Sequence, residues 1–264
     1  RKASFSFQKR PSAESRAAMR TEHRLPPRSD WLTSLEWLMM DHKDSGMSYV
    51  DFFHNQEKAC ERLQALCAPA GSEQDASDAG VSEAAIASMR AHPQAAGVQQ
   101  QGCVLLNYLC CDTDEEEDPA QLAARSQRAA EAGGIEAVVE AMRAHALVTE
   151  VQEEGATVLC NMCYGRDAAG LARAQRAVEA GAIEAVVAVM RAHAREADGV
   201  QRTGCLVLSR MCYGDYYGDN TPAVAACRQQ AVAAGAIEAV VEATRPGAPT
   251  GGDEGARFEA VRAQ

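Results

Sequence analysis

Cysteine and histidine are the residues of this 264-residue chain whose types and spacing most suggest chemistry. Three cysteine pairs share a seven-residue spacing: Cys60 with Cys67, Cys103 with Cys110, and Cys205 with Cys212. Cys160 and Cys163 have the C-x-x-C spacing of zinc and redox sites, but no second pair or histidine lies at ligand spacing. We therefore expect buried, reduced thiols. Reduced thiols indicate an intracellular, reducing compartment, either the cytoplasm or the chloroplast.

Four histidines close the same phrase in successive segments: His42, His92, His145 and His193. We expect each at the C-terminal end of a helix, where a partly positive imidazole meets the negative end of the helix dipole. Neighbouring helices lie about 8–10 Å apart, too far for adjacent histidines to share a metal ion. The sequence also lacks G-x-S-x-G, P-loop, G-x-G-x-x-G and H-E-x-x-H motifs. It therefore predicts no catalytic, cofactor-binding or metal-binding residue, and no enzyme.

The histidines are evenly placed because the chain repeats itself. One phrase occurs as GGIEAVVEAMRAH at 133–145, GAIEAVVAVMRAH at 181–193 and GAIEAVVEATR at 235–245. A second phrase follows in the same register, as VQQQGCVLLNYLC from Val98, VQEEGATVLCNMC from Val151 and VQRTGCLVLSRMC from Val200. A repeat of this length predicts a stacked array whose units contact only their neighbours.

The hydrophobic spacing within each unit is helical. Ile135, Val138, Val139 and Met142 fall at i, i+3, i+4 and i+7, as on the buried face of a helix. The V-Q phrase has a similar stripe, and a third helix, such as AQLAARSQRAAEAG, precedes these two and ends at glycine. Each unit is therefore expected to contain three helices.

Five units are expected in residues 31–264, and a basic, irregular arm in residues 1–30. The units cover 31–67, 73–111, 120–164, 170–213 and, in part, 223–264, where EGARFEAV from Glu254 aligns with EGATVLCN from Glu154. The arm has a net charge of +5, so the remainder carries −16 of the total of −11. An acidic body argues against nucleic acid as the ligand. No apolar run of about 18 residues predicts a transmembrane helix, although peripheral association of the arm with an anionic membrane surface or an acidic partner stays open.

Three helices per unit, a Gly-Gly or Gly-Ala hinge before I-E-A-V-V, and the V-Q-x-x-G/A helix resemble the armadillo repeat, and especially the alanine-rich armadillo proteins of unicellular algae. The resemblance implies an all-α, right-handed α-solenoid whose concave surface binds a protein. It covers about residues 31–245. The units are longer than usual because of inserts at 112–119, 165–170 and 214–222.

The resemblance points to the V-Q helices as the lining of the binding surface. The residues opposite the buried stripe are Gln101, Val104 and Tyr108, then Glu154, Thr157 and Asn161, then Thr203, Leu206 and Arg210. Importin-α relatives carry Trp and Asn on this helix to grip a basic peptide, and of the nine residues only Asn161 matches. Tyr216 and Tyr217, in the last insert, are further candidate contacts.

The expected function is that of a non-enzymatic scaffold or adaptor that holds a protein through its groove, inserts or arm. A structural accessory subunit of a large assembly, for example a photosynthetic complex of an algal plastid, is the first alternative. A regulatory domain of a larger enzyme is a weaker one. The acidic run Asp112 to Asp118 lacks the ligand spacing of an EF-hand loop and is expected to be solvated.

Overall fold

The computed structural model describes residues 34, 55–56, 58–63, 65, 73–111, 118–165, 167–194, 198–213 and 222–243. Regular structure in this part of the chain is entirely helical, without any strand, which confirms the prediction of an all-α fold. The helices are α5 (Glu73–Asp78), α6 (Val81–Ala91), α7 (Ala96–Cys110), α8 (Pro119–Glu131), α9 (Gly134–Ala144), α10 (Thr149–Met162), α11 (Ala168–Glu179), α12 (Ala182–Ala192), α13 (Asp198–Tyr213), α14 (Pro222–Ala233) and α15 (Ala236–Ala243).

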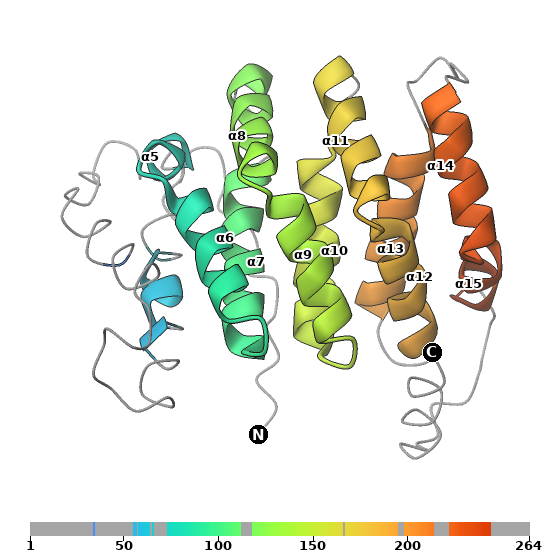
Figure 1. Ribbon diagram of the computed structural model, residues 1–264, viewed down its shortest axis with the longest axis horizontal. Coiled ribbons are helices and arrows are strands. Elements are labelled where there is room, and N and C mark those ends of the chain that lie inside the picture. Colours follow the sequence, from blue (N-terminus) through green and yellow to red (C-terminus); the bar gives the residue numbers. More distant parts are fainter. Residues whose placement is uncertain are drawn as a thin grey trace, which may run out of the picture.

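Helices of the same kind stand next to one another (Figure 1). α7, α10 and α13 contain the V-Q phrase, and α10 packs between the other two. In the same way α9 packs between α6 and α12, and α11 between α8 and α14. Figure 1 shows α8, α11 and α14 at the top, with α7, α10 and α13 behind α6, α9 and α12. Each helix is thus covered by its counterpart in the neighbouring unit.

Two inserts are shorter than the sequence suggested. Helix α8 begins at Pro119 and α11 at Ala168, so both helices take up the last residues of the predicted inserts. Asp118 accepts a hydrogen bond from the N–H of Ala120, and Asp167 accepts one from the N–H of Gly170. Both aspartates are N-caps, and proline is favoured in the first turn, which explains the earlier starts.

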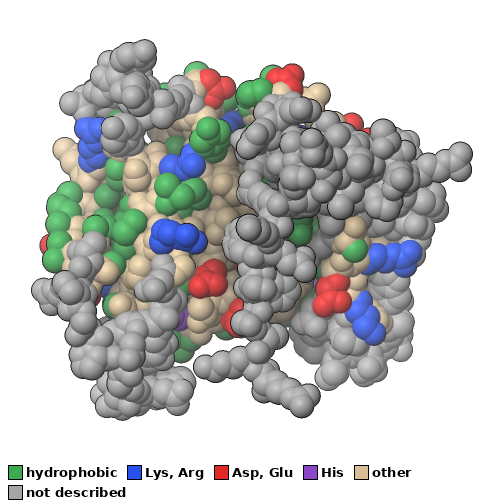
Figure 2. Space-filling model, turned by 180° about the vertical axis from the view of Figure 1, so that it is seen from behind, with side chains coloured by type: hydrophobic (Ala, Val, Ile, Leu, Met, Phe, Trp, Pro, Cys, Tyr) green, Lys and Arg blue, Asp and Glu red, His purple; other side chains and the backbone are tan. Residues whose placement is uncertain are grey.

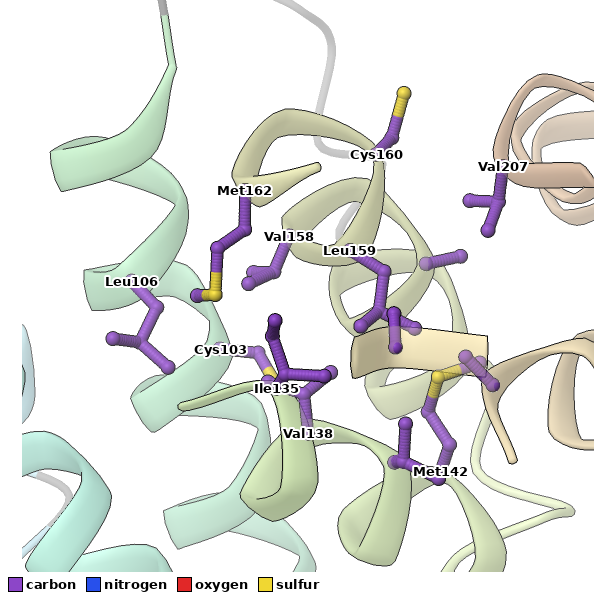
Figure 3. Packing of buried hydrophobic residues seen from close by; sticks show 14 of the residues in the cluster. Cys103, Leu106, Ile135, Val138, Met142, Val158, Leu159, Cys160, Met162 and Val207 are labelled. Atoms are coloured by element: carbon purple, nitrogen blue, oxygen red, sulfur yellow. The ribbon is translucent and has the colours of Figure 1, made fainter. Parts of the chain in front are cut away.

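The predicted hydrophobic stripes form the core. Ile135, Val138 and Met142 of α9 are buried, as are Leu159 and Met162 of α10. Figure 3 shows these α10 side chains directed toward α9. The helical spacing read from the sequence therefore identified the faces that pack together.

The glutamine of each V-Q phrase satisfies carbonyl groups at the end of the preceding helix. The Nε2 atom of Gln152 donates to the carbonyls of Met142 at 2.9 Å and His145 at 2.7 Å. Gln99 makes the same two bonds at the end of α6, and Gln201 donates to a carbonyl near the end of α12 at 2.8 Å. The last carbonyls of a helix lack partners within that helix, so this buried glutamine stabilises the turn.

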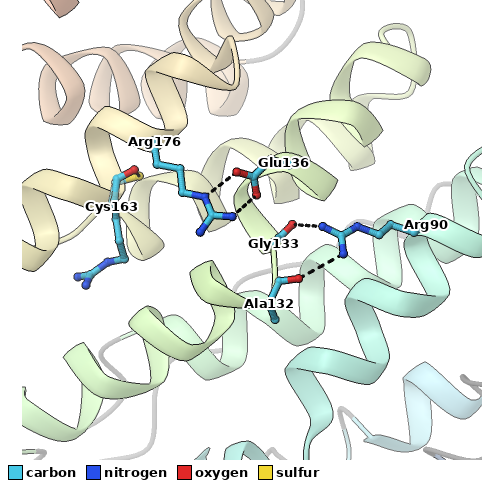
Figure 4. A network of polar contacts seen from close by, with 7 residues as sticks. Arg90, Ala132, Gly133, Glu136, Cys163 and Arg176 are labelled. Atoms are coloured by element: carbon cyan, nitrogen blue, oxygen red, sulfur yellow. Dashed lines mark hydrogen bonds and ion pairs between the residues drawn. The ribbon is translucent and has the colours of Figure 1, made fainter.

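An arginine of each MRAH phrase bonds to the glycine that starts the corresponding helix of the next unit. Arg143 donates to the carbonyl of Gly181 at 3.1 Å. Gly181 has a φ of +82°, a left-handed conformation that favours glycine. The same contact joins Arg90 to Gly133 (Figure 4) and Arg191 to Gly235. Identical contacts at three successive junctions fix the position of one unit on the next.

Glutamate in the first turn of α6, α9 and α12 makes a second junction contact. Glu136 accepts bonds from Arg176 of α11 at 2.6 and 3.0 Å (Figure 4). Arg128 bonds to Glu83 in the same way at 2.6 Å. Burial raises the pKa of Glu83, but hydrogen bonds, foremost from Arg128, outweigh burial and leave the pKa below its usual value. At the next junction the partner of Glu184 is Gln230.

The histidines make contacts that their place at a helix end did not suggest. His92, His145 and His193 are C-caps of α6, α9 and α12, as predicted, while His42 lies outside the described residues. In addition, Nε2 of His145 donates to the carbonyl of Pro93 at 2.8 Å, and Nε2 of His193 to that of Ala146 at 3.2 Å. Both acceptors belong to the preceding unit. These two rings therefore connect one unit to the next, a role that the helix dipole did not predict.

Candidate functional site

The nine predicted groove residues lie on α7, α10 and α13, which pack side by side. We call them the V-Q face: Gln101, Val104, Tyr108, Glu154, Thr157, Asn161, Thr203, Leu206 and Arg210. None of the nine is fully buried, and Leu206, at 46 % exposure, is the most open. Figure 2 shows the molecule from the side of these helices, with apolar, basic and acidic side chains interspersed. The V-Q face therefore offers several kinds of contact over three neighbouring helices.

An amide pair connects two helices of the V-Q face. Nδ2 of Asn161 donates to Oδ1 of Asn107 on α7 at 2.8 Å. Asn107 was not predicted, because it lies one position before Tyr108, the residue that aligns with Asn161. Thr157 donates to the carbonyl of Glu153 within its own helix at 2.7 Å. Asn161 is thus held in place by α7, and among the described residues its side-chain oxygen accepts no hydrogen bond.

A tyrosine that follows the C-terminal end of α10 stacks on an arginine of α13. The guanidinium carbon of Arg210 is 4.5 Å from the ring centre of Tyr164, within the range of a cation–π contact. Tyr164 is 54 % exposed, while the Nε atom of Arg210 is buried without a hydrogen-bond partner among the described residues. Sequence analysis did not single out Tyr164; the recurrence of Cys-Tyr-Gly at 163–165 and 212–214 was the available signal.

Glu154 is the acidic member of the V-Q face. Its side chain is half-buried, and burial raises its pKa, with a smaller contribution from the negative charge of Glu153. No neighbouring cation lowers the pKa of Glu154. Such a partly desolvated carboxylate is a better partner for an incoming lysine or arginine than a carboxylate that already forms an ion pair. The V-Q face therefore has an acidic position on α10 and a basic position, Arg210, on α13.

The cysteines lie mainly in the core as free thiols. Burial raises the pKa of both Cys110 and Cys163 to about 12, and raises the pKa of Cys103 as well. Such thiols stay protonated at neutral pH and are poor nucleophiles and metal ligands. Cys205 and Cys212 are only half-buried, which corrects the expectation of buried thiols at these two positions. Cys163 is the C-cap of α10.

In the described ranges, no group of three or more His, Cys, Asp or Glu side chains is placed to hold a metal ion. Every described helix is too short or too polar to cross a membrane. The remaining predicted contacts, Tyr216 and Tyr217, lie outside the described residues, as do residues 112–117 and the arm at 1–30. The candidate site therefore consists of the V-Q face together with Asn107 and Tyr164.

Comparison of the chain with protein-family models, with curated proteins and with solved structures found no match in any of the three. The repeated architecture is therefore supported by contacts within the chain itself. Equivalent glutamine, arginine and histidine contacts recur at successive junctions. The V-Q face repeats with them, since it lies on the helices that these contacts position.

Proposed function

We propose that this chain is a non-enzymatic scaffold or adaptor, a right-handed α-solenoid of armadillo-like repeats that binds another protein on the V-Q face. The observation that carries the proposal is the side-by-side placement of α7, α10 and α13, with different side chains at equivalent, accessible positions. Val104, Thr157 and Leu206 form one such row across the three helices. A repeated backbone with varied side chains recognises a ligand one unit at a time.

The dimensions of the V-Q face favour a short extended segment as the ligand. Three helices packed about 10 Å apart span about 20 Å, which is the length of about six residues of extended chain. Leu206 and Tyr164 supply exposed apolar area, and the Asn161 amide supplies a hydrogen-bonding group. Apolar area beside a few fixed polar groups is typical of peptide-binding surfaces.

The two charged positions suggest which charged side chains the ligand carries. Arg210 fits an acidic side chain near α13, and Glu154 fits a basic one near α10. A ligand of mixed charge agrees with the absence of a uniform basic or acidic row on the nine residues. The free thiols support a reducing, intracellular location for this interaction.

Selection of random twelve-residue peptides from a display library against the full chain tests this proposal. Enriched peptides should bind at least about tenfold more weakly to the double variant Leu206→Asp, Tyr164→Ala, since small hot spots dominate such interfaces. Both positions are exposed, so the variant should fold normally.

The matched control is the double variant Ala124→Asp, Ala172→Asp, which changes exposed positions of α8 and α11. It should retain peptide binding in full. If the selected peptides bind the two double variants equally, the ligand does not occupy the V-Q face and the proposal fails.

A further inference from the structure

Two charged residues of the V-Q face have no opposite charge beside them in the described part of the chain. The groups beside Arg210 are the ring of Tyr164, 4.5 Å away, and the thiol of Cys160. Burial raises the pKa of that thiol, and the charge of Arg210 offsets this only in part, so the thiol is neutral at physiological pH. The charge that acts on the carboxyl of Glu154 is the like charge of Glu153. Both charges are therefore free to attract a ligand.

The contact with Tyr164 limits how a ligand can approach Arg210. The ring covers one flat face of the guanidinium group, whose N–H donors all lie in the plane of that group. Arg210 is half-buried, and its buried nitrogen is Nε. The terminal nitrogens along the edge of the group match the two oxygens of a carboxylate. An acidic side chain that arrives along this edge is therefore the group that fits.

Glu154 and Arg210 lie on a diagonal of the V-Q face, on helices α10 and α13, which pack side by side. In the repeat register Arg210 aligns with Asn161, seven residues after Glu154. Seven residues rise about 10 Å along a helix, and packed helices lie about 10 Å apart, so about 15 Å separates the two positions. Thr157 and Leu206, which align with each other, lie between the two charges, and Leu206 is 46 % exposed.

This diagonal fixes the spacing of charges in an extended ligand. An extended chain advances about 3.3 Å per residue, so about four residues cover the distance, whereas a helix would need about ten. Successive side chains of an extended chain point to opposite sides. The residues at i, i+2 and i+4 therefore all point toward the same surface.

We propose that the V-Q face recognises an extended segment in which a basic, an apolar and an acidic residue stand at alternate positions. Lys or Arg of the ligand contacts Glu154, the apolar side chain contacts Leu206, and Asp or Glu, four positions from the basic residue, contacts Arg210. Either direction of the ligand chain satisfies this spacing. The inference rests on the proposed function, since it specifies the ligand of that same surface.

Selection from peptide libraries on the full chain tests the spacing. In libraries of sixteen-residue peptides, Lys and Glu are fixed two, four or ten positions apart, in both orders, with Leu midway and uncharged residues elsewhere. Enrichment from the libraries with four-residue spacing should exceed that from the others at least about tenfold, because a hydrogen bond to a charged group is lost at the other spacings.

Uncharged variants show which charges meet. Replacing the Glu of a selected peptide by Gln should weaken binding to the parent chain about tenfold but leave binding to the Arg210→Gln variant unchanged. Replacing the Lys of the peptide by Met should still weaken binding to Arg210→Gln, which shows that the variant is folded, but should have no effect on Glu154→Gln. The matched control is Lys58→Met, at an exposed position in the segment 58–63, which lies at the other end of the row from α13 (Figure 1). This control should retain both losses.

Failure of this inference can be distinguished from failure of the proposed function. Equal enrichment at all spacings, or enrichment mainly at two or ten residues, would overturn the inference. A loss from Glu to Gln in the peptide that persists in Arg210→Gln would overturn it as well. If such peptides still bind the Leu206→Asp, Tyr164→Ala variant more weakly, the proposed function stands without the charge spacing. Peptides that bind this variant as tightly as the parent chain, or no enrichment from any library, would contradict both.

Discussion

Met142 and Gly155 fit one another across the contact between α9 and α10: the Met142 Cγ lies 2.8 Å from where a Cβ on Gly155 would stand. Met89 with Gly102 and Met190 with Gly204 repeat this relationship at 2.5 and 2.7 Å. The methionine of the MRAH phrase and the glycine of the V-Q phrase therefore recur together because one fills the space that the other leaves.

Gly155→Ala should destabilise the chain. In an open helix this change gains up to about 1 kcal/mol, but here the new methyl group overlaps Met142, and overpacking costs about 1–3 kcal/mol. Urea unfolding measures the difference. In a Met142→Ala background, Gly155→Ala should lower the free energy of unfolding much less, because the space for the new methyl group is free. An equal loss in both backgrounds would show that the two side chains do not compete.

Ile183→Asp should unfold the centre of the stack, because it places a charge in a fully buried position without a partner. The matched control is Ile237→Asp at the equivalent, exposed position of α15, which should leave the main thermal transition in place. Circular dichroism during heating measures both. Similar melting of the Ile183 variant and the parent chain would contradict this register of the repeats.

Arg173→Met should destabilise the chain by about 2–4 kcal/mol, since it leaves buried acceptors without donors. Arg173 is buried and donates to the carbonyls of Met162 at 2.7 Å and Tyr164 at 2.8 Å. Three residues on, Arg176 makes a half-exposed ion pair with Glu136, so Arg176→Met should cost about 1 kcal/mol or less. A larger loss from Arg176→Met than from Arg173→Met in denaturant unfolding would reverse this ranking.

Stability should fall as the pH rises above about 8.5, the usual pKa of a free thiol. Burial raises the pKa of Cys110 and Cys163 to about 12, so the folded chain keeps both protons while the unfolded chain loses them. The unfolded state then binds fewer protons, and the free energy of unfolding falls by up to about 1.4 kcal/mol per pH unit for each thiol.

Urea unfolding between pH 7.5 and 10.5 measures this slope. The variant Cys110→Ala, Cys163→Ala should be less stable at pH 7.5 but should show a shallower decline with pH. A decline as steep as that of the parent chain would assign the pH dependence to other groups.

The periodicity of the sequence predicted the helices and their buried faces, because apolar spacing follows directly from the geometry of one helix. It did not predict the contacts between units. Gln152 donates to the carbonyl of His145 at the end of α9, and the His145 ring donates to the carbonyl of Pro93. Only the packing of the helices brings these groups together. In the sequence these residues have the appearance of ordinary polar surface.

The candidate site was predicted less completely than the fold. The alignment placed nine residues on neighbouring helices, but the partner of Asn161 is Asn107, which the repeat register assigns to a different position. Tyr164 lies beyond the last residue of α10 and was therefore not counted as part of the V-Q face. Its contact with Arg210 depends on the distance between two units, which spacing along one chain does not give.

Site-specific photo-crosslinking tests the proposed function most directly. A benzophenone amino acid replaces Leu206 on the V-Q face in one sample and Ala172 on α11 in the other, and each chain is irradiated in an extract of its source cells. A discrete product that forms from position 206 and is lost with Tyr164→Ala, without a counterpart from position 172, is the predicted result. The same product from both positions, or from position 172 alone, would contradict a protein-binding role for the V-Q face.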